Sequence, residues 1–200
     1  MESEFDQDVN RALEKWPNVP ACYGWLKLDR RGNWLIKDQP ITHKRSIEFL
    51  SRNYANDGAG QWFVQNGPQR AYCDLAYTPW VYHLDGHRQL FTHVQSAVEN
   101  LSSIIIDEDG NLLLETEFGI GVLHDSDLVP FFDVLAHHQN KQHNADDLMA
   151  MMLNLNRSAK DTAEICWQHG PLRLRTMLSD DIPREFNFVV APIESNAEID

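Results

Sequence analysis

Leu28-Asp29-Arg30-Arg31-Gly32-Asn33-Trp34 and, later in the chain, Asp107-Glu108-Asp109-Gly110-Asn111 are the two stretches that decide the fold. Both contain the pattern Asp-x-x-Gly-Asn, and apolar runs stand on either side of each. A glycine-bearing polar turn between two apolar runs predicts a β-hairpin, because glycine and asparagine tolerate the backbone angles of a tight turn. The sequence therefore predicts one such hairpin in each half of the chain.

An internal duplication is predicted because further matches follow the two turns in the same order in both halves. The matches are His43-x-x-x-Ile47 with His124-x-x-x-Leu128, Gln65-Asn66-Gly67-Pro68-x-Arg70 with Gln168-His169-Gly170-Pro171-x-Arg173, and Leu75 before Pro79 with Leu178 before Pro183. The alternative is two unrelated hairpins that both use Gly-Pro turns.

The apolar faces of the expected strands agree with this duplication. Trp34 and Ile36 correspond to Leu112 and Leu114, which are apolar in both copies. A second set aligns Gln69, Ala71, Cys73 and Leu75 with Leu172, Leu174, Thr176 and Leu178. Side chains alternate along a strand, so these residues would point one way and the matched arginines of the Gly-Pro turns the other way.

We therefore expect an α+β protein with two similar β-rich lobes, each made of hairpins packed on a helix. The expected domain organisation is an N-terminal helix in 1–20, a first α+β repeat in 21–86, a connection in 87–100, a second repeat in 101–193 with a helical insertion near 140–160, and a flexible tail in 194–200.

The first half of the chain also resembles a known kind of protein. The residues that carry this resemblance are the Leu28–Trp34 stretch, Pro40-Ile41, Gly60-Gln61-Trp62 and Thr78-Pro79-Trp80-Val81. They are similar to the motifs of proteobacterial families of unknown function, one of which has Asp-x-x-Gly-x-Trp, then Pro-Ile, then a Pro-Phe-Val-type strand. The resemblance implies a fold of repeated α+β motifs and a role in signal transduction, and it transfers no catalytic residue.

Charge and composition narrow the possible partners. The 200 residues contain 17 Lys and Arg against 30 Asp and Glu, for a net charge of −13. Nucleic-acid binding and anionic-lipid binding both depend on clustered cations, so neither partner is expected. The three cysteines form no disulfide or zinc pattern, and we expect neither a signal peptide nor a membrane-spanning segment. We expect a cytoplasmic protein.

The paired arginines are the strongest candidates for a functional site. Two guanidinium groups at equivalent places in two repeats could hold a small anionic ligand at the surface between the lobes. The residues expected to contribute are Arg70, Arg173, Gln65, Gln168, Trp62 and His169. The alternative is that each arginine forms an ion pair with a nearby carboxylate and only covers its sheet.

No nucleophile, phosphate-loop or zinc-protease motif occurs in the sequence, which favours a non-enzymatic function. The leading hypothesis is a cytoplasmic binding or regulatory module that recognises a small molecule or a protein, with no cofactor and with homodimerisation as an option. The alternative is a metal-assisted hydrolase that uses His124 with Asp125, Asp127 or His169, since histidine and carboxylate side chains are metal ligands.

Overall fold

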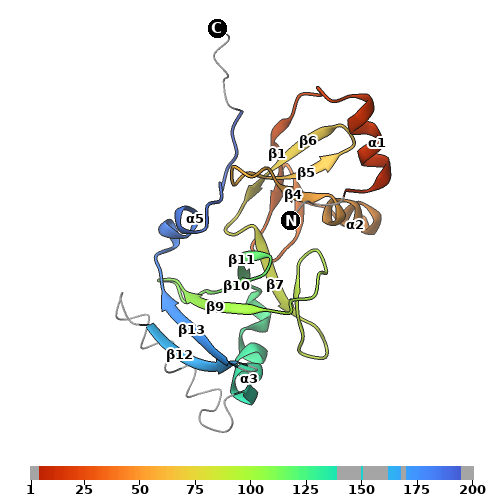
Figure 1. The fold of residues 1–200 in the computed structure, drawn as a ribbon. Coiled ribbons are helices and arrows are strands. Elements are labelled where there is room, and N and C mark those ends of the chain that lie inside the picture. Colours follow the sequence, from red (N-terminus) through yellow and green to blue (C-terminus); the bar gives the residue numbers. More distant parts are fainter. Residues whose placement is uncertain (1–4, 139–149, 151–161, 168–169, 195–200) are drawn as a thin grey trace. The chain divides into compact units, whose positions relative to one another are not determined.

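The structure is a computed structural model that describes residues 5–138, 150, 162–167 and 170–194 (Figure 1). The chain forms two compact units. The first consists of residues 1–29, 33–79 and 187–200, and the second of residues 30–32 and 80–186. The domain boundaries expected from the sequence follow the repeats rather than compactness, and they stay a prediction. Most of the expected insertion near 140–160 lies outside the described residues.

Unit 1 contains a six-stranded sheet in the order β3-β2-β1-β6-β5-β4. Its elements, in chain order, are α1 (Gln7–Lys15), β1 (Cys22–Leu28), β2 (Trp34–Ile36), β3 (Gln39–Pro40), α2 (Lys44–Arg52), β4 (Tyr54–Asn56), β5 (Trp62–Asn66) and β6 (Gln69–Leu75). Strands β1 and β6 are parallel, and all other neighbours in this sheet are antiparallel.

Unit 2 contains a seven-stranded sheet in the order β12-β13-β9-β10-β11-β7-β8. Its elements are β7 (Trp80–Leu84), β8 (Leu90–Thr92), β9 (Leu101–Ile106), β10 (Leu112–Thr116), β11 (Gly119–Leu123), η1 (Asp125–Asp127), α3 (Leu128–His138), β12 (Thr162–Trp167), β13 (Gly170–Thr176), η2 (Ser179–Asp181) and α5 (Ile182–Glu185). No helix in the described ranges is both long enough and apolar enough to cross a bilayer.

The two sheets share a five-stranded arrangement, which confirms the predicted α+β class with two similar β-rich lobes. Reading along each sheet, β3-β2-β1-β6-β5 corresponds to β11-β10-β9-β13-β12. The parallel pair lies at the same place in both, between β1 and β6 and between β9 and β13. A helix, α2 or α3, connects the third and fourth of these strands along the chain. We call these two sets of elements the first repeat and the second repeat.

The hairpin turns Asp29–Asn33 and Asp107–Asn111 are built in the same way in both repeats. In each, the first aspartate accepts two hydrogen bonds from the asparagine four residues later, one from its backbone N–H and one from its side chain, at 2.7–2.9 Å. An aspartate side chain that accepts hydrogen bonds from residues further along the chain closes the turn, and the aspartate itself keeps an ordinary backbone conformation. The Asp-x-x-Gly-Asn pattern does not reveal two related turns: Asp57 accepts both the backbone and the side-chain N–H of Gln61, and Asp85 accepts the backbone N–H of Gln89.

Strand register corrects the predicted alignment of the Gly-Pro turns by two residues. In the first repeat the last pair before the turn is Asn66 with Gln69, and in the second repeat it is Trp167 with Gly170. Gly67-Pro68 is therefore equivalent to 168–169. A shift of two residues preserves the face of every side chain, so the predicted apolar face is right although the predicted partners are not.

The corrected register gives the following equivalences. Leu26, which pairs with Ile36 and Cys73, corresponds to Ile104, which pairs with Leu114 and Leu174. By the same count Ala71 corresponds to Leu172, Tyr72 to Arg173 and Arg70 to Pro171. Trp34 and Ile36 correspond to Leu112 and Leu114, as the sequence predicted.

The helices of the two repeats begin alike but pack differently. Both are preceded by a histidine N-cap, and the side chains of His43 and His124 accept the backbone N–H of Ser46 and Ser126. Helix α3 then buries Phe131, Phe132 and Leu135 almost completely against its sheet. Helix α2 buries none of its residues. One repeat thus has a filled helix–sheet core, and the other does not.

Candidate ligand pocket

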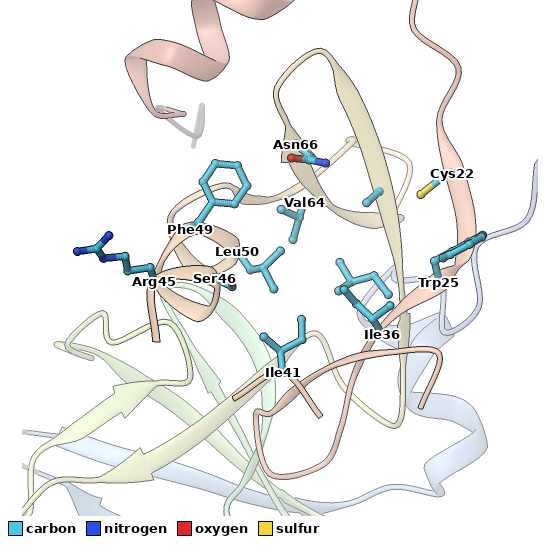
Figure 2. Close-up of a pocket in the computed structure, with 12 residues that line it drawn as sticks. Cys22, Trp25, Ile36, Ile41, Arg45, Ser46, Phe49, Leu50, Val64 and Asn66 are labelled. Carbon is cyan, nitrogen blue, oxygen red and sulfur yellow. The ribbon is translucent and has the colours of Figure 1, made fainter. Parts of the chain in front are cut away.

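Unit 1 contains a groove of about 470 Å³ between α2 and one face of its sheet (Figure 2). Helix α2 and Ile41, which lies three residues before it, form one wall, β1 and β2 form the other, and β5 and β6 provide the floor. The lining residues are Cys22, Trp25, Leu26, Ile36, Ile41, Arg45, Ser46, Phe49, Leu50, Val64, Asn66 and Ala71. This volume lies within the range of about 300–1,000 Å³ that is usual for small-molecule sites.

The groove exists because the first repeat carries small side chains where the second carries large ones. On the strand that forms the floor, Ala71 and Cys73 occupy the positions of Leu172 and Leu174, which are 1% and 0% exposed. The helices show the same difference. Counted along the chain from the capping histidine, Leu50 and Ser51 of α2 stand where α3 has Phe131 and Phe132.

The wall formed by β1 depends on a β-bulge. The pairing of β1 with β6 shifts between Cys22 and Leu26, and Gly24 has φ of 68° in the left-handed region that glycine tolerates best. The shift lets Trp25 line the groove together with Cys22 and Leu26, although strict alternation would not place all three on one face. Trp25 is 52% exposed, and the ammonium of Lys37 lies 3.6 Å from its ring centroid.

Polar groups in the lining are few. Arg45, Ser46 and Asn66 are the polar members apart from the thiol of Cys22, and none of the described residues that line the groove carries a carboxylate. In a chain with 30 acidic residues, a lining that contains one cation and no anion is a local reversal of the overall charge. Such a lining favours a neutral or anionic ligand over a cationic one.

Ser46 lies 3.2 Å from Nδ1 of His43, a distance that would also suit a nucleophile and its base. The second repeat contains the same contact, since Ser126 Oγ lies 2.8 Å from Nδ1 of His124. Both histidines cap the helix that follows, and this accounts for the contact in each repeat without catalysis.

The two described cysteines of this face differ in accessibility. Cys22 lines the groove and is half-buried, and burial raises the pKa of its thiol. Cys73 is 0% exposed, and burial raises the pKa of its thiol much further. Cys22 can therefore report on occupancy of the groove, whereas Cys73 is protected from solvent.

Comparison with known proteins gives a family but no activity. A family model named DUF2944, described as "Protein of unknown function (DUF2946)", matches residues 5–193. The chain belongs to this family. This confirms the predicted relationship to families of unknown function. No curated protein matches the chain with significance.

Two solved structures resemble part of the chain. One is a DUF1285 family protein from Silicibacter pomeroyi DSS-3, with 12% identity, a TM-score of 0.45, and coverage of 61% of this chain and 75% of that one. The other is a DUF1285 family protein from Shewanella baltica OS155, with 12% identity, a TM-score of 0.40, and coverage of 54% of this chain and 89% of that one.

Of the residues that the sequence singled out in unit 1, Gln65 and Arg70 stand opposite each other on β5 and β6, and Trp62 lies on the other face of the sheet. The guanidinium of Arg70 lies 4.5 Å from the ring centroid of Phe63, on the sheet face opposite the groove. Gln65 is fully buried, and its side chain donates to the carbonyl of Gly67 at 3.0 Å. Trp62 packs against Tyr54, with the ring centroids 4.8 Å apart. Arg70 and Trp62 thus extend from opposite faces of the sheet.

The remaining candidates belong to unit 2. Arg173 is exposed on β13, opposite Glu164 in the strand pairing, and its register does not match that of Arg70. Gln168 and His169 lie outside the described residues. The two arginines are therefore not equivalent by register, and whether either binds a ligand stays a prediction.

The histidine and carboxylates proposed for a metal each have a local partner. His124 caps η1, Asp125 forms an ion pair with Arg31 at 2.6 Å, and Asp127 accepts the backbone N–H of Leu84 at 2.9 Å. The Arg31 guanidinium lowers the pKa of Asp125. Within the described ranges, no group of three or more histidine, cysteine or carboxylate side chains could hold a metal ion.

Sequence reasoning missed the groove. The signal was present in the small residues Ala71 and Cys73, which stand opposite two leucines once the repeats are aligned by strand register. The two-residue error in alignment paired Ala71 with Leu174 and Cys73 with Thr176 instead. In that pairing Cys73 stands opposite Thr176, a residue of similar size, so the difference in side-chain volume at this position is hidden.

Proposed function

We propose that this protein is a non-catalytic binding module, of a regulatory kind, whose ligand occupies the groove of the first repeat. The observation that carries the proposal is the difference between the repeats. One helix–sheet interface is filled by leucine and phenylalanine side chains, and the equivalent interface is open over about 470 Å³.

The chemistry of the lining supports this proposal. Pockets for small molecules are mostly apolar, with a few polar groups that fix orientation, and the groove has this composition. Trp25 and Ile36 extend the apolar surface beyond the groove, since they are 52% and 48% exposed. Exposed tryptophan and isoleucine side chains next to a cavity are typical of surfaces that a ligand covers.

Alkylation of Cys22 tests whether the groove binds a ligand. The full chain with Cys166→Ser leaves Cys22 as the accessible thiol, because Cys73 is buried. A neutral apolar dye such as Nile red should fluoresce on binding and should slow the reaction of Cys22 with iodoacetamide. Ala71→Leu should abolish both effects, because leucine fills the floor of the groove.

Ala76→Leu is the matched control, since Ala76 is exposed just beyond the end of β6 and does not line the groove. This variant should bind the dye like the parent. Dye binding that survives Ala71→Leu, or no protection of Cys22 by any apolar probe, would show that the groove is not the site.

The anionic-ligand site predicted around Arg70 and Arg173 is a separate proposal. It expects Arg70→Ala to reduce ligand-induced thermal stabilisation in a screen of anionic metabolites, and it expects Ala71→Leu to leave that stabilisation unchanged. The groove proposal expects the reverse. Cytoplasmic location and homodimerisation stay predictions, and light scattering tests the latter.

A further inference from the structure

We infer that the groove of the first repeat accepts an unbranched aliphatic carboxylate, with the acyl chain along the floor and the anionic head beside Arg45. This inference rests on the proposed function, and it adds the chemical class of the ligand. Three features of the groove lead to it: the aliphatic character of the floor, the unpaired cation at one side, and the small volume.

The interior of the groove is aliphatic, whereas its aromatic residues stand on the walls. Leu26 and Val64 are almost fully buried beneath it, and Ala71 adds a single methyl group to the floor. In Figure 2, Leu50 and Ile41 lie on the side of α2, and Ile36 lies across from them. A trough of branched aliphatic side chains offers dispersion contacts to a flexible methylene chain and no hydrogen-bond partners to a polar ring.

Arg45 differs from the other cations that the structure describes in the first unit. Four of those cations have carboxylate partners, namely Arg11 with Asp8, Lys27 with Asp38, Lys44 with Glu48, and Arg52 with Asp6. The other three, Lys15, Lys37 and Arg70, lie over the rings of Trp16, Trp25 and Phe63. Arg45 forms neither kind of contact with any described residue, although 30 acidic residues are present in the chain. A guanidinium without a partner at the side of an apolar groove is suited to a carboxylate, which it can bind through two parallel hydrogen bonds.

Arg45 is the one cation among the described residues that line the groove, and none of these residues carries a carboxylate. Lys37 is not a lining residue, but its ammonium lies 3.6 Å from the ring centroid of Trp25, which is one. An alkylammonium ligand would meet repulsion from Arg45, and a carboxylate would meet attraction.

The volume of the groove argues against a protein segment as the occupant. A single turn of α-helix with its side chains, about 10–12 Å across and 5.4 Å long, occupies on the order of 400–600 Å³. The groove, at about 470 Å³, would hold only about one such turn. A stable protein interface covers roughly 800 Å² on each partner, far more than one helical turn provides.

Binding of straight-chain carboxylates to the full chain tests the inference. Calorimetry would compare hexanoate through tetradecanoate, below their micelle concentrations, with the 1-alkanols of equal length. Each added methylene should tighten binding by about threefold to fourfold until the groove is full. The carboxylates should bind roughly three- to tenfold more tightly than the alcohols, because Arg45 is exposed and its contribution is reduced by solvent.

Arg45→Gln should remove the preference for carboxylates and leave alcohol binding unchanged. The residue is exposed and forms no ion pair with the described residues, so folding should be unaffected, and Arg11→Gln on α1 is the control cation outside the groove. Protection of Cys22 from alkylation by the bound acyl chain would place the ligand in the groove.

Several results would overturn the ligand class while leaving the groove as a binding site. They are equal affinity for alcohols and carboxylates, no effect of Arg45→Gln, tighter binding of alkylammonium ions, or tighter binding of an aromatic carboxylate such as naphthoate. Failure of every probe, including neutral Nile red, to protect Cys22 would instead remove the proposed function itself.

Discussion

Replacing Ala71 by leucine would give the first repeat the residue that the second repeat has at the equivalent position, Leu172. The variant is informative because the two possible states of this site predict opposite effects. If the floor of the groove is open, the added side chain gains contacts. If the site is already packed, the same side chain must displace its neighbours.

The expected magnitude follows from the size of the added group. Leucine adds three carbons to alanine, and full burial at about 0.8 kcal/mol per methylene would contribute roughly 2.4 kcal/mol. The groove is open on one side, so only part of this is realised, and ordering a leucine side chain costs about 0.5–1 kcal/mol. We expect a net gain of about 0.5–1.5 kcal/mol in the free energy of unfolding. Overpacking would instead cost about 1–3 kcal/mol.

Urea denaturation of the full chain measures the effect, and the reciprocal variant Leu172→Ala provides the comparison. Leu172 is 1% exposed in a filled core, so its truncation should cost about 2–5 kcal/mol. The reasoning predicts opposite signs for two substitutions at equivalent positions. Destabilisation of Ala71→Leu by more than about 1 kcal/mol would show that the floor of the groove is already packed, and the account of the groove would then be wrong.

Three further predictions test individual features of the structure. Gly24→Ala should lower the free energy of unfolding by about 1–2 kcal/mol, because φ at Gly24 is 68° and nothing lies within 4 Å of an added Cβ. Gly86→Ala is the control and should be near neutral, since its site is equally open and its φ is not positive. Equal urea midpoints for the two variants would contradict the role given to the bulge. Tyr82→Phe should lower the free energy of unfolding, measured by urea denaturation, by about 1–3 kcal/mol. The buried Tyr82 hydroxyl hydrogen-bonds the hydroxyl of Thr116 at 2.7 Å and donates to the carbonyl of Gly119 at 2.8 Å. A decrease below about 0.5 kcal/mol would argue against these bonds. Arg52 lowers the pKa of Asp6, so this ion pair stabilises the fold above a pH of about 4 and loses its effect as the pH falls through the lower pKa of the folded state. Asp6→Asn should therefore reduce the free energy of unfolding by less than about 1 kcal/mol at neutral pH and leave it unchanged at a pH of about 2. Curves of stability against pH that stay parallel for the two proteins would refute this role of the ion pair.

Much of the architecture was readable from short motifs. The Asp29 and Asp107 turns were found because their hydrogen bonds involve residues only four apart, so the motif carries its own structure. The histidine matches were found for the same reason, since His43 and His124 cap the helices that begin just after them. Local interactions of this kind depend on a few neighbouring residues, and the sequence displays them directly.

The candidate site was much less accessible to sequence reasoning. The sequence pairs Arg70 with Arg173 because each follows a Gly-Pro pair, but strand register offsets them by two residues. Side-chain alternation could not reveal this error, because a slip of two residues leaves every side chain on its original face. The register is fixed by hydrogen bonds between strands that are distant in the sequence.

Taken alone, the sequence determined that this protein is an α+β duplication with hairpin turns closed by aspartate, since those features arise from contacts within a few residues. Only the tertiary structure decided that Ala71 stands where the other copy has Leu172, and that α2 leaves open the space that α3 fills. The physical reason is that a cavity is the difference between the volume enclosed by several elements and the volume of the side chains inside it. No single segment of the chain encodes that difference.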